Sequence, residues 1–136
     1  MNKADLEKRT KTFALRVIQF VSSLSKNKVA DVLGYQFLKS GTAVGANYRE
    51  ANRAESRKDF IHKIGIVEKE ASETQYWLEL LDESNIGSAT ERQWLLRESG
   101  ELIAIFTSIG KTAKNNIRNT KSDSRNSQPA DHKSRS

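Results

Sequence analysis

The sequence contains no cysteine, only one proline, Pro129, and no long apolar run. The absence of cysteine excludes a disulfide framework, thiol catalysis and a cysteine-ligated zinc site. Because Pro129 is the single proline, the first 128 residues lack the strongest helix breaker. This composition argues against a sandwich or barrel rich in turns and favours helices.

Transmembrane and export signals are also missing. The longest uncharged stretches, among them 40–48 and 102–110, have nine residues each, whereas a membrane-spanning helix needs about 20 apolar residues. Residues 1–12 are charged throughout and lack the apolar segment of a signal peptide. We therefore expect a protein with no membrane contact, located in the cytoplasm.

A chain of 136 residues suits one domain with a tail, and it carries a net charge of +6. That charge is unevenly distributed along the sequence. Residues 1–58 carry a net +7, residues 59–110 a net −6 and residues 111–136 a net +5. Such polarisation suits either a basic surface for a polyanion or subunits whose basic and acidic sides face each other.

Four segments have the apolar periodicity of amphipathic helices. Their expected ranges are about 3–24, 28–54, 57–81 and 89–118. Ser56 and Ser88 precede the last two as N-cap residues, and Ser88 starts a capping box that ends at Glu91. The apolar faces of the four segments are Leu6, Phe13, Val17, Phe20, Val21 and Leu24; Val29, Leu33, Phe37, Val44, Tyr48 and Ala51; Phe60, Ile64, Val67, Ala71, Thr74, Leu78 and Leu81; and Leu95, Leu102, Phe106 and Ile109.

Helices of this length joined by short loops predict an all-α fold. We expect an up-down-up-down antiparallel four-helix bundle over residues 1–118. Residues 119–136 are rich in Asn, Ser, Lys and Arg and have no aromatic residue. This composition predicts a disordered basic tail.

The second helix carries small residues where an isolated helix would be weak. Gly41 and Gly45 each cost roughly 1 kcal/mol relative to alanine, so we expect another helix to approach closely there. The same helix has a second apolar side, and the third helix has apolar side chains flanking its seam. Exposed apolar surface on two helices suggests a homo-oligomer interface. Its candidate residues are Tyr35, Leu38, Thr42, Ala46 and Trp77.

Candidate catalytic chemistry is sparse. His62 lies off the apolar seam of the third helix, and His132 lies in the tail. Glu70 and Glu73 are neighbours on the helix surface, but no Glu-x-x-His motif accompanies them. We expect a protein that is not an enzyme, with no metal site and no cofactor.

A group of basic residues is the remaining candidate site. Arg49, Arg53 and Arg57 follow one another at four-residue steps, and Lys39 lies on a similar side of the helix. Guanidinium groups at this spacing suit the phosphates of a nucleic-acid backbone. Ion pairing of the arginines with Glu50 is an equally good interpretation.

Two long sequence runs resemble one bacterial protein family. They are LKSGTAVGANYREANRAESRKDF at 38–60 and KEASETQYWLELL at 69–81. Both are similar to the four-helix-bundle proteins encoded in intervening sequences of 23S ribosomal RNA genes. The resemblance is close over residues 13–81 and covers the fourth helix only by pattern.

The resemblance implies a bundle that assembles into a ring, commonly a pentamer, in bacteria or phage. It also implies a relative, the accessory variability protein of diversity-generating retroelements, which binds nucleic acid and a reverse transcriptase through a basic surface. By similarity, that surface would contain Lys39, Arg49, Arg53 and Arg57. We therefore expect a non-enzymatic, oligomeric protein that binds nucleic acid, with RNA preferred over DNA. The alternative is a homo-oligomeric scaffold that binds a protein partner.

Overall fold

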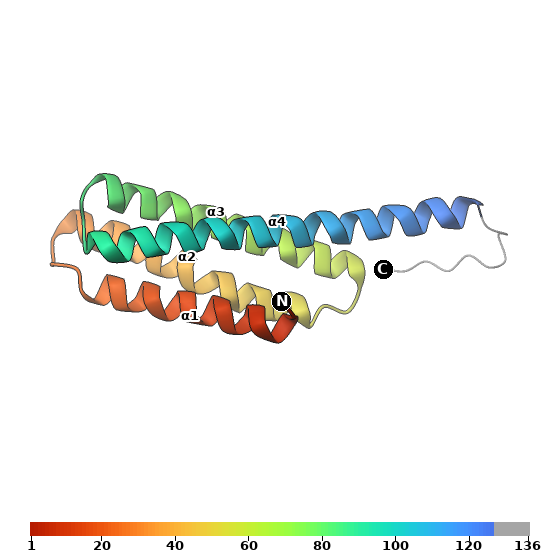
Figure 1. Ribbon diagram of the computed structural model, residues 1–136, viewed down its shortest axis with the longest axis horizontal. Helices are drawn as coiled ribbons and strands as arrows, with labels where there is room; N and C mark the ends of the chain where they lie inside the picture. Colours follow the sequence, from red (N-terminus) through yellow and green to blue (C-terminus); the bar gives the residue numbers. More distant parts are fainter. Residues whose placement is uncertain (127–136) are drawn as a thin grey trace.

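The computed structural model describes the backbone of residues 1–126 and the side chains through residue 119. Its elements are α1 (Lys3–Ser22), α2 (Lys28–Asn52), α3 (Arg57–Glu83) and α4 (Ala89–Asn126). Consecutive helices run in opposite directions side by side, as Figure 1 shows. The predicted all-α, up-down-up-down bundle is confirmed.

Each helix begins at a side chain that accepts a hydrogen bond from a backbone amide of the first turn, which would otherwise lack a partner. Asn2 and Asp5 form a capping box at the start of α1. The Asn27 side chain accepts from the Ala30 amide at 2.9 Å at the start of α2. The predicted caps of α3 and α4 are confirmed: Ser56 accepts from the Asp59 amide at 3.1 Å, and Ser88 accepts from the Glu91 amide at 3.3 Å.

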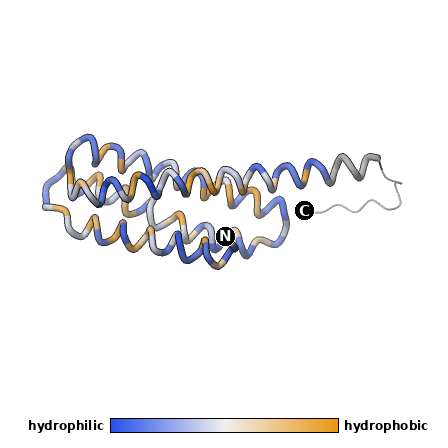
Figure 2. The backbone as a smooth tube through the Cα atoms, viewed as in Figure 1, coloured by the Kyte–Doolittle hydropathy of each residue, from blue (hydrophilic) through white to orange (hydrophobic). Residues whose placement is uncertain are grey.

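The core contains the predicted apolar faces of all four helices. Its largest buried side chains include four phenylalanines, and Phe20 and Phe37 meet edge to face with ring centroids 6.0 Å apart. One prediction for α2 is wrong, because Val29 is exposed and its neighbour Ala30 is buried instead. Figure 2 shows apolar positions recurring along every helix within the bundle. The buried hydrophobic residues are Leu6, Phe13, Val17, Phe20, Ala30, Phe37, Val44, Tyr48, Ala51, Ile64, Val67, Ala71, Leu78, Leu81, Leu95, Leu102 and Phe106.

The two glycines of α2 lie against α1, as their small size predicts. A Cβ atom on Gly41 would lie 3.0 Å from a methyl carbon of Val17. A Cβ atom on Gly45 would lie 3.1 Å from the hydroxyl of Thr10. The hydrogen side chains therefore let the two helices approach more closely than alanine would allow.

Helices α1 and α4 pack less closely than the three sequential pairs, and charged groups bridge them. Arg9 donates from Nε and Nη2 to the two carboxylate oxygens of Glu98, at 2.8 Å each. Arg16 pairs with Glu91 at 3.0 Å, and its guanidinium lies 3.9 Å from the centroid of the Trp94 ring. Polar and cation–π contacts thus stabilise this seam where apolar packing is thinner.

The α3–α4 connection is tied to α4 by the buried side chain of Arg92. Its Nε donates to Asp82 at 2.7 Å, and its Nη1 donates to the carbonyls of Ile86 and Gly87. Gly87 has a φ of 82°, which a residue with a side chain rarely adopts. The connection therefore combines a glycine turn with a buried charged contact.

Helix α4 extends beyond the end of the bundle where α1 begins (Figure 1). It continues to Asn126, whereas the sequence predicts that the helix and the domain end near 118. Between Gly110 and Asn126 the chain has neither glycine nor proline, so nothing in the backbone forces the helix to stop. The predicted disordered tail otherwise lies outside the described residues. No described helix is both long and apolar enough to cross a bilayer.

Candidate functional site

The four predicted basic residues do not form one stripe along a helix. Helix α2 ends at Asn52, Arg53 is its C-cap residue, and Arg57 is the first residue of α3. Arg53 and Arg57 therefore lie on either side of a short connection. The regular four-residue spacing of the arginines continues across a helix end, so it does not indicate a common face.

Lys39 and Arg49 face different neighbours. The charge of Lys39 acts on Glu70 of α3, where burial and then repulsion from Glu73 raise the pKa, and Lys69 and Lys39 lower it. Arg49 lies against α1, with its Nε 3.7 Å from a carboxylate oxygen of Glu7. The structure therefore separates Lys39 from Arg49 and places only the arginines near the end of the bundle.

The end of the bundle that carries Arg53 and Arg57 also carries cations that the sequence prediction missed. The antiparallel arrangement brings together the start of α1, the α2–α3 connection and the part of α4 after Gly110. Residues 102–119 contain no Asp or Glu. Within the described residues, six exposed cationic side chains of the α2–α3 connection, the first turn of α3 and residues 111–119 of α4 make no ion pair: Arg53, Arg57, Lys58, Lys111, Lys114 and Arg118. We call these six residues the basic end.

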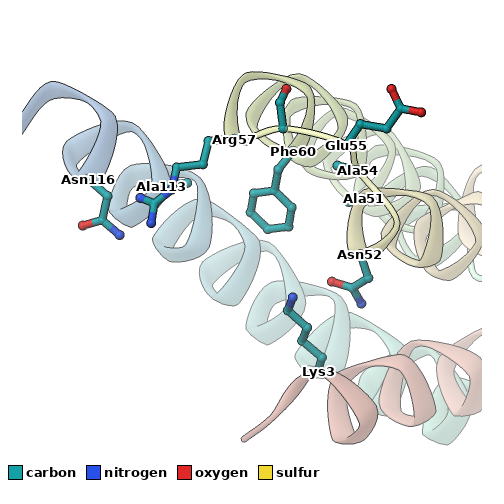
Figure 3. Close-up of a pocket in the computed structure, with 10 residues that line it drawn as sticks. Lys3, Ala51, Asn52, Ala54, Glu55, Arg57, Phe60, Ala113 and Asn116 are labelled. Carbon is teal, nitrogen blue, oxygen red and sulfur yellow. The ribbon is translucent and has the colours of Figure 1, made fainter. Parts of the chain in front are cut away.

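A cleft opens beside the basic end, between the start of α1 and helix α4. Two adjoining hollows of about 400 and 530 Å³ share Lys3, Asn52 and Phe60 as lining residues. Figure 3 shows the Phe60 ring pointing into the first hollow, with the side chains of Lys3 and Asn52 across from it. The remaining lining residues are Met1, Asn2, Leu6, Tyr48, Ala51, Ala54, Glu55, Ser56, Arg57, Ala104, Ile105, Ser108, Ile109, Ala113 and Asn116.

Asn52 is a polar residue that lines both hollows. Its Nδ2 donates to Glu7 at 2.9 Å, which fixes the orientation of the amide. Its Oδ1 is buried and accepts no hydrogen bond from the described part of the protein. Burial raises the pKa of the neighbouring Tyr48 hydroxyl. A side-chain hydrogen bond with Asn52 lowers this pKa, and the negative charge of Glu7 raises it.

Comparison with known proteins identifies the family. The model of the 23S rRNA-intervening sequence protein family matches residues 2–108. The chain belongs to that family. The matched range covers α1, α2, α3 and the part of α4 that packs in the bundle.

A solved structure resembles this member of the 23S rRNA-intervening sequence protein family over nearly its whole bundle. It is a protein of unknown function from the S23 ribosomal protein family of Bacteroides thetaiotaomicron VPI-5482, 37% identical in sequence. The match has a TM-score of 0.74 and covers 82% of this chain and 99% of that chain. No curated protein matches the chain.

Four of the five predicted interface residues of this family member lie on α2, and Trp77 lies on α3. Thr42 and Ala46 line a shallow hollow of about 280 Å³ between α1 and α2. Tyr35 is 60% exposed, whereas Leu38 and Trp77 are half-buried and pack against the core. Part of the expected interface is therefore occupied by contacts within the subunit.

Other apolar side chains are more exposed than most of the predicted interface set. The sequence prediction treated these five side chains differently, since it placed Val29 in the core and Tyr76 beside the seam of the third helix. They are Leu15 and Ile18 on α1, Val29 and Val32 on α2, and Tyr76 on α3. Their exposure ranges from 42% to 56%.

The acidic and histidine candidates differ in their exposure. His62 is exposed, Glu70 is half-buried and Glu73 is exposed. Among the described residues, no group of three or more His, Asp or Glu side chains is arranged to hold a metal ion. His132 lies outside the described residues.

Proposed function

We propose that the protein is a non-enzymatic, oligomeric nucleic-acid-binding protein, with RNA as the preferred nucleic acid. The observation that supports this proposal is the basic end, whose six cations are exposed and make no ion pair within the described residues. A paired cation must break its ion pair before it can contact a phosphate, whereas an unpaired one is available at no such cost. The preference for RNA rests on family resemblance.

The arrangement of the cations supports an extended partner. Arg53, Arg57 and Lys58 surround the α2–α3 connection, and Lys111, Lys114 and Arg118 continue along the overhang of α4. Lys111, Lys114 and Arg118 follow one another at steps of three and four residues, so they lie along one face of the helix. A nucleic-acid backbone offers phosphates along a comparable line.

Substitution of three cations tests the location of the interface. We expect Arg53→Gln, Arg57→Gln and Lys114→Gln together to weaken binding of single-stranded RNA and to reduce the salt slope by about 2, since each phosphate contact contributes about 0.7. The matched control replaces Lys26, Lys28 and Arg97, which are also exposed, with Gln. An equal loss in both variants would show that net charge, and not the basic end, determines binding.

The exposed apolar side chains favour a second candidate, a homo-oligomeric scaffold for a protein partner. Leu15, Ile18 and Tyr35 are 42–60% exposed on α1 and α2, and apolar surface of this kind is typical of subunit or partner contacts. A reverse transcriptase is the partner that the family resemblance implies. Two results together would favour the scaffold. The oligomer would bind no nucleic acid at low salt, and the Tyr35→Lys substitution would make it dissociate.

A further inference from the structure

The cleft beside the basic end has an origin in the lengths of the helices. Helix α1 begins at Lys3 and α2 ends at Asn52, whereas α4 continues far beyond both. Phe60 is therefore only partly covered at this level of the bundle. The α1–α4 pair is also the least closely packed of the neighbouring helix pairs. The two hollows have volumes within the range of about 300–1,000 Å³ that is typical of small-molecule sites.

The lining presents an aromatic ring within an apolar surface. Phe60 is half-buried and its ring points into the hollow in Figure 3. Leu6, Ile105 and Ile109 line the adjoining hollow. A flat aromatic ligand can pack on Phe60 and remain in contact with aliphatic side chains, which is how proteins commonly hold unpaired nucleobases.

One acceptor is fixed toward the same space. Because Asn52 Nδ2 donates to Glu7 at 2.9 Å, the amide cannot rotate without losing that hydrogen bond. Its Oδ1 is buried and receives no donor from the described residues. A buried acceptor without a partner is unfavourable, so a ligand that displaces the groups covering Oδ1 and brings an N–H donor to it would gain affinity.

Two cations flank the cleft. Lys3 and Arg57 both line the first hollow, and neither makes an ion pair within the described residues. An ammonium and a guanidinium at the rim of an apolar hollow suit a ligand with an anionic end. The cleft thus combines an aromatic surface, a buried acceptor without a partner in the described residues, and two cations.

We propose that the cleft binds a nucleotide whose base carries an exocyclic amino group: adenine, cytosine or guanine. The base packs on Phe60, its amino group donates to Asn52 Oδ1, and its phosphate is held by Lys3 and Arg57. This inference rests on the proposed function, since it makes the cleft a base-binding subsite of the nucleic-acid interface. The same chemistry is available in a free mononucleotide and in an unpaired nucleotide of a strand.

Other small-molecule classes match fewer of these groups. A fatty acid would fill the apolar lining and meet the cations but would leave Asn52 Oδ1 without a donor. A sugar phosphate would meet the cations but would place polar groups against Phe60 and Ile109. Only an aromatic ring with a donor on its edge and an anionic substituent satisfies all three features.

The first test compares three ligands of the full chain by calorimetry and by amide chemical shifts. Adenosine 5′-monophosphate should bind about tenfold more tightly than purine riboside 5′-monophosphate, which lacks only the amino group. Ribose 5-phosphate, which lacks the base, should bind most weakly. Equal binding of all three would overturn the proposal, because phosphate alone would then account for the affinity.

Variants assign the contact to the cleft. Phe60→Ala should weaken binding of adenosine 5′-monophosphate by about tenfold, and Phe60→Trp should retain it, because an aromatic ring remains for stacking. Asn52→Ala should remove the preference for the amino group. The control is Tyr76→Ala, which removes an aromatic side chain that is 52% exposed on α3. Unchanged ligand preference in Asn52→Ala would overturn the assignment.

A single-stranded RNA separates this inference from the proposed function on which it rests. The wild type should bind an ordinary adenine-containing strand more tightly than the same strand with abasic positions, and Phe60→Ala should abolish that difference. If both strands bind equally in a salt-dependent way, the base site fails and the proposed function stands. If neither strand binds, the proposed function fails. If only the mononucleotide binds, the cleft is a free-nucleotide site and the proposed role as a subsite is wrong.

Discussion

At the scale of single residues, the contact between α1 and α2 depends on the missing side chain of Gly41. A Cβ atom at this position would lie 3.0 and 3.1 Å from two methyl carbons of Val17, which is fully buried and β-branched. Gly65, on α3, has no heavy atom within 4 Å of its virtual Cβ atom. Replacing either glycine with alanine therefore changes the helix propensity equally, but only at Gly41 does the added methyl group meet a close neighbour.

We expect Gly41→Ala to lower the free energy of unfolding by about 1 kcal/mol, because overpacking outweighs the gain in helix propensity. Gly65→Ala, the matched control, should raise it by about 0.5–1 kcal/mol, because only the propensity changes. Urea denaturation measures both. A similar gain in both variants would show that α1 moves freely away from α2.

Glu70 gives a prediction about pH. Burial and repulsion from Glu73 raise its pKa above the ordinary value, so the folded state binds this proton more tightly than the unfolded chain. The contribution of Glu70 to stability is therefore complete at low pH and is lost as the pH rises through the unfolded and then the folded pKa.

Glu70→Gln removes that dependence because the amide is neutral at every pH. We expect the variant to be more stable than the wild type at about pH 7 and to lose this advantage at about pH 4. Thermal unfolding at the two pH values measures the difference. Glu79→Gln on the exposed side of α3 is the control. An advantage that is larger at the lower pH would contradict the account.

The sequence predicted the burial of side chains correctly where burial follows the helical repeat, and it failed to predict burial near the starts of α2 and α3. The seam from Ile64 to Leu81 is buried at every predicted position, because long helices in a bundle keep a constant face toward the core. Val29 is exposed because it lies in the first turn of α2, where Ala30 faces the core. Phe60 is only half-buried because it lies beside the cleft, which no pattern in one helix can reveal.

At the scale of elements, the α3–α4 turn depends on Arg92. Its side chain is 7% exposed, and it satisfies Asp82 together with the carbonyls of Ile86 and Gly87. Asp82 has 26% of its side chain exposed, so water can replace only part of the hydrogen bonding that Arg92 gives to its carboxylate.

We expect Arg92→Met to lower the free energy of unfolding by about 2 kcal/mol, because two carbonyls and a carboxylate lose a charged donor while the apolar volume is retained. Chemical denaturation measures this loss. Arg97→Met, an exposed position on the same helix, should change stability by less than about 0.5 kcal/mol. Equal effects would mean that Arg92 acts only through packing.

The starts of the helices were predictable because capping is a local interaction, and Ser56 and Ser88 act as expected. The end of α4 was not predictable in the same way. The sequence after residue 118 has no apolar face to pack, but a helix without a breaker continues through its own backbone hydrogen bonds. Composition indicates where packing ends, and it does not indicate where a helix ends.

At the scale of the whole molecule, the charge is polarised along the bundle axis. The basic sequence regions 1–58 and 111–136 are far apart in sequence, yet the antiparallel order brings Arg53, Arg57 and Lys114 to one end. The opposite end contains Glu79, Asp82 and further acidic residues of the −6 region. Sequence reasoning identified the polarisation and assigned it to one stripe of α2, because the contribution of α4 depends on how the helices align.

The salt dependence of binding to single-stranded RNA tests the central claim most directly. Five or six phosphate contacts at the basic end predict that the affinity falls by roughly 100- to 300-fold between about 50 and 200 mM salt, with a linear relation between the logarithms of affinity and salt concentration. Fluorescence anisotropy with the full chain measures this relation. A single-stranded RNA that does not bind at the lowest salt, or binds with an affinity independent of salt, would contradict the account.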